Sequence, residues 1–273
     1  MHRCQRSKPS IAWHGHRLPV STTTARSAQL VEPPSVRDGG RYFAWLYSPA
    51  DARAGVAAVI QIERAIFDSV GSGFDHAVSH ARLGWWQDEL AQLGTGTPRH
   101  PATQALAKAS TQLRLPALEL ALLVQQAEWE LAQASLADSA ARTRYFKNWG
   151  RAVTRTVALL GWGSERGNPR LPADSLALID HFGSSAGEAM RELETLDTSP
   201  EHATSRESSG ALRARLIEVA EALPPALAPS QRGMLVWLQL IVQDETPGPP
   251  TAWTAWRAAR RAMRGIPHLR LRR

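Results

Sequence analysis

Two histidines four residues apart are the first residues whose types and spacing suggest chemistry. His76 and His80 would share one face of a helix, and imidazole nitrogens are zinc ligands. A zinc site needs at least one further protein ligand. Cys4 is the single cysteine of the chain, and the sequence offers no identifiable third ligand. We therefore expect no metal at this pair.

The stretch from Gly183 to Gly187, Gly-Ser-Ser-Ala-Gly, matches the G-x-S-x-G pattern of serine hydrolases. That pattern works only on a sharp turn between a strand and a helix. No strand pattern precedes Gly183, so we do not expect a nucleophilic serine there. The small residues instead predict a place where two helices pack closely.

Carboxylates at helical spacing are the third candidate. Glu188 and Glu192 lie four residues apart on one predicted helical face. Two carboxylates placed in this way can share a hard, oxygen-seeking cation such as Mg²⁺. Arg191 lies beside them, and a mixture of both charges is typical of a helix face in water. The sequence favours this second interpretation.

The elements that would position these residues are helices, because apolar residues recur at steps of three and four and alternating β-type patterns are absent. No repeat of fixed period occurs, which argues against a solenoid. The sequence therefore predicts an all-α chain. The predicted helices are 52–70, 78–93, one opening at Pro101, 113–136, 139–160, 172–196, 209–223, 229–242 and 251–264.

A tryptophan pair marks the helix predicted at 78–93. The run reads Arg82-Leu-Gly-Trp85-Trp86, continues with Glu89-Leu90, and is followed after a Gly/Pro loop by His100-Pro101. This run resembles the squalene/phytoene synthase family, which joins prenyl diphosphates head to head on an all-α isoprenoid-synthase fold. The resemblance extends more weakly over residues 42–264. It implies a bundle of about eight to ten helices within a domain spanning 41–266.

The resemblance also implies where catalytic carboxylates should lie. Enzymes of the family hold Mg²⁺ between two facing helices that each carry Asp-x-x-x-Asp. In this chain Glu63 has Phe67 four positions on, and Asp68, five positions on, is about 140° around the helix. On the second helix Asp180 has Ser184 at the partner position, and the family's following Gly-Arg-x-Tyr-Leu-Pro is missing.

Loss of one charge-stabilising group typically costs on the order of 10²–10³ in rate. We therefore expect a degenerate, non-catalytic member of the family that needs no cofactor, similar in this respect to a mitochondrial complex I assembly factor of this fold. It would act in binding or assembly, with an isoprenoid or other lipid-like ligand or a protein partner. Glu63, Arg82 and Asp180 would lie nearest the position of the family's catalytic site, where they would form internal ion pairs. The alternative is a Mg²⁺-dependent prenyl-diphosphate transferase that uses Glu63 with Glu188 and Glu192.

Positive charge gathers at both ends of the 273-residue chain. Of the net charge of +7, residues 1–41 contribute +5 and residues 250–273 contribute +7, which leaves −5 for the rest. An acidic body disfavours nucleic-acid binding. We expect residues 1–40 to be a disordered extension and 267–273 a basic tail. No apolar run reaches 18 residues, so we expect a cytoplasmic protein, with peripheral attachment to a membrane as the alternative.

The last predicted helix combines tryptophans with arginines. Apolar area beside cations suits a helix lying on an anionic membrane surface. A final bundle helix that docks its tryptophans on the core would give the same pattern. The candidate surface residues are Trp253, Trp256, Arg257, Arg260 and Arg261.

Overall fold

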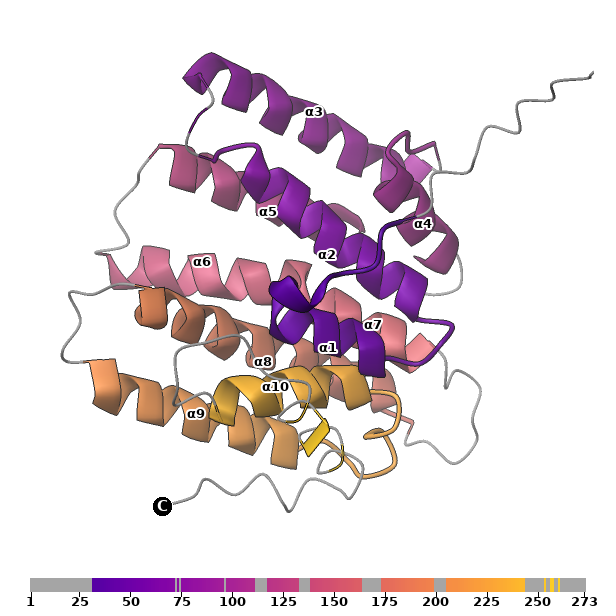
Figure 1. The fold of residues 1–273 in the computed structure, drawn as a ribbon, viewed down its shortest axis with the longest axis vertical. Helices are drawn as coiled ribbons and strands as arrows, with labels where there is room; N and C mark the ends of the chain where they lie inside the picture. The colour runs from indigo at the N-terminus through magenta and orange to yellow at the C-terminus, as the bar shows by residue number, and fades with distance from the viewer. Residues whose placement is uncertain are drawn as a thin grey trace, which may run out of the picture. The chain divides into compact units, whose positions relative to one another are not determined.

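The computed structural model describes residues 31–243, apart from 72, 74, 96, 111–116, 133–137, 164–172 and 199–204, together with residues 253, 256, 257 and 260. Within these residues the regular structure is ten α-helices and one 3₁₀-helix, with no strand (Figure 1). The all-α prediction is confirmed. None of the described helices is long and apolar enough to cross a membrane.

The helix bounds follow the predicted pattern for most of the chain. In order they are η1 (Val36–Asp38), α1 (Gly40–Tyr47), α2 (Arg53–Asp68), α3 (His76–Thr95), α4 (Pro101–Ser110), α5 (Ala117–Leu131), α6 (Ser139–Ala152), α7 (Thr154–Gly163), α8 (Ser175–Thr198), α9 (Ser205–Glu221) and α10 (Arg232–Gln243).

The single helix predicted over 139–160 is wrong, because the chain breaks at Val153 into α6 and α7. The hydroxyl of Thr154 donates to the carbonyl of Gly150 and, at 2.6 Å, to the carbonyl of Gly183 on α8. A threonine that bonds back to the preceding turn bends a helix. The tertiary contact with α8 adds to that bend, and the local apolar period gives no sign of it.

Order also begins earlier than the predicted boundary at residue 41. The one-turn helix η1 lies within the stretch predicted to be disordered, and Asp38 in it pairs with Arg64 of α2 at 3.3 Å. Residues 1–30 and the predicted tail at 267–273 lie outside the described residues.

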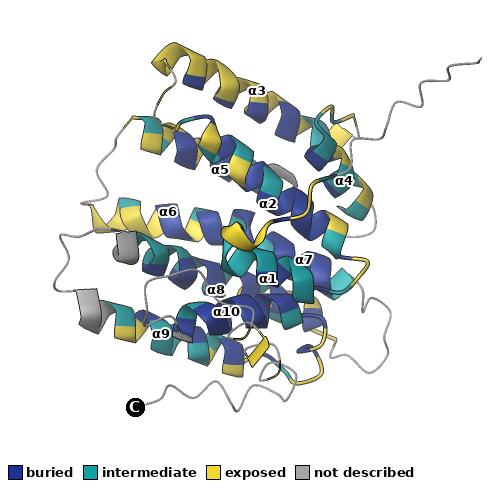
Figure 2. Cartoon of the chain, in the orientation of Figure 1, coloured by how far each residue is buried: buried dark blue, intermediate teal, exposed yellow. Residues whose placement is uncertain are grey.

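The helices pack as a bundle in which α8 is central. It contacts α6, α7 and α9, while α3 packs on α5 and α4, α2 packs on α4 and α7, and α1 lies on α10. Figure 1 shows α3 at the top and α9 at the bottom of this arrangement, with α6 and α8 between them. Buried side chains line the helix faces that meet their neighbours, and exposed residues follow the outer side of α3 (Figure 2).

Two glycines bring α6 and α8 together. A Cβ atom on Gly187 would lie 1.8 Å from the Thr154 hydroxyl oxygen and 2.6 Å from the Cα of Gly150. No larger residue fits this crossing without moving the helices. The interpretation of the G-x-S-x-G stretch as a close helix contact is therefore confirmed.

The tryptophan motif that suggested the family joins α3 to α4. Glu89 is fully buried, and its carboxylate accepts from the backbone N–H groups of Arg99 and His100, both at 2.7 Å, and from the Thr103 hydroxyl. It thereby satisfies N–H groups at the start of α4 that have no partner within the helix. The ring of His100 packs 4.9 Å from that of buried Trp86. The motif has a structural role here.

Candidate functional site

Helix α1 carries the central residue of the site, and glycines fix its position. A Cβ on Gly40 would lie 2.2 Å from the indole of Trp237 on α10, and one on Gly233 would lie 2.2 Å from the carbonyl oxygen of Ala44. The backbones of α1 and α10 therefore approach closely. Arg41 follows Gly40 directly, and its partly buried side chain extends toward α2 and α8.

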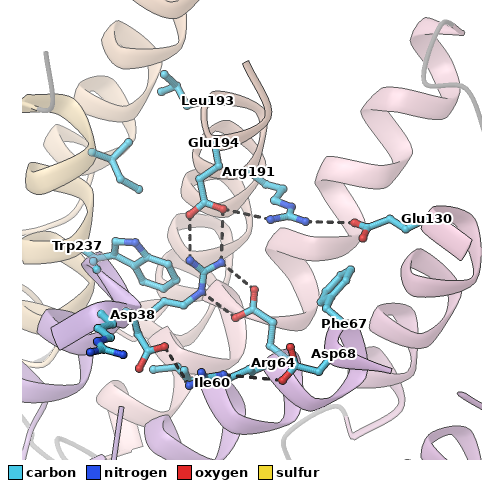
Figure 3. A pocket seen from close by; sticks show the side chains of 16 residues that line it. Asp38, Ile60, Arg64, Phe67, Asp68, Glu130, Arg191, Leu193, Glu194 and Trp237 are labelled. Carbon is cyan, nitrogen blue, oxygen red and sulfur yellow. Dashed lines mark hydrogen bonds and ion pairs between the residues drawn. The ribbon is translucent and has the colours of Figure 1, made fainter. Parts of the chain in front are cut away.

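The guanidinium of Arg41 bridges two carboxylates from different helices. It contacts both oxygens of Glu63 on α2, at 2.8 and 3.0 Å, and both oxygens of Glu194 on α8, at 3.2 and 3.4 Å. In Figure 3, dashed lines join the carboxylate of Glu194 to the guanidinium of Arg41 directly below it. Fork-shaped pairs of this kind are among the strongest hydrogen bonds in proteins.

Aromatic rings enclose the same guanidinium. Its central carbon lies 5.6 Å from the ring centroid of Trp149 and 5.3 Å from that of Trp237. Both indoles are almost fully buried, and the Trp149 N–H donates to Glu63 at 2.9 Å. Contact with indole faces stabilises a desolvated cation. The site therefore stabilises a partly buried positive charge.

A second arginine extends the network toward α5 and α6. Arg191 pairs with Glu194 at 3.3 Å and with Glu130 at 3.4 Å, and it donates to the Tyr145 hydroxyl at 3.0 Å. Figure 3 shows Arg191 lying between Glu194 and Glu130. Two arginines and three glutamates from four helices thus form one connected group.

The pKa values follow from burial and from these partners. Burial alone would raise the pKa of Glu63, but the adjacent Arg41 guanidinium outweighs it, so the pKa is lowered and the carboxylate stays charged. Burial by itself would lower the pKa of Arg41, and its two carboxylate partners raise it instead. Burial raises the pKa of Tyr145 to about 12, and the Glu130 carboxylate adds to that increase. These three groups therefore each keep one protonation state at neutral pH.

A pocket of about 620 Å³ opens beside this network. Its volume lies in the range of small-ligand sites. Charged side chains of both signs and apolar side chains share its wall. The apolar ones come from α2, α8 and α10, and they are Ile60, Phe67, Leu193, Trp237 and Ile241.

The resemblance to the synthase family implies Mg²⁺ between the two carboxylate helices, and the residues present do not fit that ion. Glu63 and Glu194 are the carboxylates that meet across the bundle, and every one of their oxygens accepts from a guanidinium. Mg²⁺ needs free oxygen ligands, and Arg41 and Arg191 would repel it. In the part of the chain that the structure describes, no three His, Cys, Asp or Glu residues are grouped to hold a metal.

The structure separates the other residues predicted to lie near the site. Arg82 is exposed on α3. Asp180 pairs with Arg155, which also contacts Glu119, and it lies fourteen residues, or about 21 Å along α8, from Glu194. Of the predicted set Glu63, Arg82, Asp180, Glu188 and Glu192, only Glu63 lines the pocket.

The two glutamates of the enzyme alternative lie on another face of α8. Glu188 pairs with Arg215 of α9 at 3.0 Å. Partial burial raises the pKa of Glu192, with Glu188 adding to the effect and Arg142 and Arg215 opposing it. Glu192 and Glu194 are two residues apart, so about 200° of helix separates them. That rotation explains why Glu194, and neither of the predicted pair, meets Arg41.

Sequence reasoning missed Arg41, Arg191 and Glu194. Two faint signals exist. Arg41 is a single charged residue directly before the uncharged, largely apolar stretch Tyr42–Tyr47. Arg191 and Glu194 have the i, i+3 spacing of an ion pair on one helix. Neither signal identifies a partner on another helix.

Comparison with known proteins agrees with this architecture. The sequence model described as squalene/phytoene synthase matches residues 37–208, which is more than half of the 273-residue chain. No curated protein and no solved structure gives a significant match. The matched region runs from η1 into α9 and includes the tryptophan motif and both carboxylate helices. The chain belongs to the squalene/phytoene synthase family, and its described helices have an all-α, isoprenoid-synthase-like fold.

Proposed function

We propose that this protein is a non-catalytic member of its family that binds an isoprenoid or other lipid-like ligand and acts in binding or assembly. One observation carries the proposal. The guanidinium of Arg41 lies between Glu63 and Glu194 and contacts every oxygen of both carboxylates, and Glu63 is the residue at which the resemblance would put the first metal ligand.

The chemical reason concerns charge. A prenyl diphosphate ionises only when the departing diphosphate is neutralised, and bound metal ions act as Lewis acids in that step. The negative charge of Glu63 and Glu194 is already matched by Arg41 and Arg191. These carboxylates therefore have no capacity left to recruit a divalent cation.

The pocket supports the binding role. Apolar side chains form part of its wall, while the arginines and glutamates of the network beside them are paired with one another. An apolar chain with a small polar head matches such a lining better than a diphosphate with several negative charges does. The ligand class is therefore a prenyl alcohol or a related neutral lipid.

The enzymatic test is incubation of the purified protein with farnesyl or geranylgeranyl diphosphate and Mg²⁺, followed by measurement of pyrophosphate. We expect no release above the rate without protein. Sustained release that is lost on Glu188→Gln or Glu192→Gln would overturn the proposal in favour of the transferase alternative, which places catalysis on those residues with Glu63.

The binding test uses radiolabelled farnesol and geranylgeraniol with the full chain. Ile241→Trp should fill the pocket and weaken binding by on the order of tenfold, because Ile241 lines it. Leu176→Trp is the matched control, since Leu176 is exposed near the start of the same helix α8 that carries Glu194. If Ile241→Trp and Leu176→Trp bind the prenyl alcohols equally well, or if neither binds them, the proposal of a lipid-like ligand in this pocket is contradicted.

A further inference from the structure

Two tryptophans near the end of the chain lie stacked and exposed. The rings of Trp253 and Trp256 have centroids 4.8 Å apart and an interplanar angle of 17°. Trp253 is 61% exposed and Trp256 is 41% exposed. These side chains are therefore not docked on the core, as a final bundle helix would require.

Each of these rings is paired with an arginine four residues further on. The guanidinium carbon of Arg257 lies 5.9 Å from the Trp253 centroid, and that of Arg260 lies 5.1 Å from the Trp256 centroid. All four residues are helical. Arg261, the fifth residue predicted for this surface, lies outside the described residues. Aromatic area and fixed positive charge are thus presented together.

The composition around these residues sets the charge of the partner. Residues 250–273 contain seven arginines and no acid, whereas the part of the chain between residues 42 and 249 has a net charge of −5. A partner must therefore be negatively charged where it meets this end and must accept indole rings. An anionic lipid bilayer has both properties at its interface.

We propose that the surface formed by Trp253, Trp256, Arg257 and Arg260 attaches the protein to anionic membranes. Nucleic acid fits less well. Single-stranded nucleic acid binds by stacking its bases on free aromatic faces, and here the indoles stack on each other while arginines cover them.

The contact is peripheral, since no described helix could span a bilayer. Each basic residue near an anionic surface is worth about fivefold in binding, so losing two costs about 25-fold. The indoles add apolar area, whose loss costs on the order of tenfold. Binding should therefore weaken as the ionic strength rises, because salt screens the contribution of the arginines.

The test is flotation of the full chain with vesicles of phosphatidylcholine alone and vesicles that also contain phosphatidylglycerol. We expect binding to the anionic vesicles only, with the losses just given for Arg257→Gln/Arg260→Gln and for Trp253→Ser/Trp256→Ser. The matched controls are Trp85→Ser, at a tryptophan that is 40% exposed on α3, and Arg142→Gln/Arg144→Gln, which removes the same charge from exposed positions on α6.

Three results would overturn the proposal. One is binding to neutral vesicles as tight as to anionic ones. Another is a control variant that loses as much vesicle binding as the tryptophan or arginine variant to which it is matched. The third is a gel shift in which single-stranded RNA binds more tightly than the anionic vesicles do, which would assign the surface to nucleic acid. Failure of the farnesol experiment would leave this inference intact, because the pocket and this surface share no residue.

Discussion

At the scale of single residues, Arg41 supplies a covalently attached cation to two carboxylates on different helices. A metal site between helices must keep unpaired carboxylates ready for its ion, and these repel each other when the ion is absent. A guanidinium that contacts Glu63 and Glu194 at once removes that repulsion permanently. The same contact makes the carboxylates dependent on Arg41.

Arg41→Met should therefore destabilise the protein by roughly 3–5 kcal/mol, because a buried Glu63 would be left without its main partner. Chemical denaturation at neutral pH measures the change. Arg64→Met is the control, since Arg64 is largely exposed and pairs with Asp38 and Asp68, and it should cost about 1 kcal/mol or less. Adding Glu63→Gln to Arg41→Met should restore part of the loss. Equal effects of the two methionine variants would contradict the central role of Arg41.

We expect the charged carboxylate of Glu192 to lower the stability of the fold at neutral pH. Partial burial raises its pKa, so the folded protein binds this proton more readily than the unfolded chain does. The cost is therefore present above the raised pKa and is relieved as the pH falls toward the ordinary value of 4.5. Glu192→Gln should raise the melting temperature at pH 7, and this gain should shrink toward zero as the pH approaches 4.5. A gain that grows on acidification would show the opposite sign and refute this account.

At the scale of elements, the position of α8 decides most of the site. It supplies Glu194 and Arg191, and it crosses α6 at the contact between Gly150 and Gly187. That crossing brings α6, which carries Trp149 and Tyr145, against the helix that carries the second carboxylate. The small residues thus support the site without touching its charges.

Gly187→Ala should destabilise the bundle by about 2–3 kcal/mol or more, because its Cβ would overlap the Thr154 hydroxyl and crowd the backbone of Gly150. The variant should unfold at lower denaturant concentration. Gly84→Ala is the matched control, since nothing lies within 4 Å of its added Cβ and alanine favours the helix α3 by about 1 kcal/mol. A Gly187→Ala variant as stable as the parent would show that α6 and α8 can separate freely.

At the scale of the whole molecule, the charge distribution separates two regions of different character. The interior network pairs its charges within the protein, between helices that are far apart in sequence. The arginine-rich end has no acids of its own and presents exposed indoles. A protein that binds a lipid-like ligand in its bundle and an anionic membrane with its end would work at the membrane surface, where such ligands are found.

The sequence by itself determined the helical class, most helix positions and the family. These depend on local information, since an apolar period of three and four and a motif within 20 residues can be read along the chain. It also singled out Glu63, which lies on α2 and lines the pocket. The sequence alone also shows that no carboxylate lies four residues after Glu63 or four residues after Asp180, because this spacing can be read directly along the chain.

Only the tertiary structure decided which charges meet. Arg41 is separated from Glu63 by 22 residues and from Glu194 by 153, and no periodicity links such positions. The choice of Glu194 over Glu192 depends on about 200° of rotation around α8, which is set by the packing of that helix on α6, α7 and α9. The break at Val153 has the same origin, because Thr154 finds its second hydrogen-bond acceptor on another helix. Contacts between distant segments arise from packing, and local sequence patterns do not encode them.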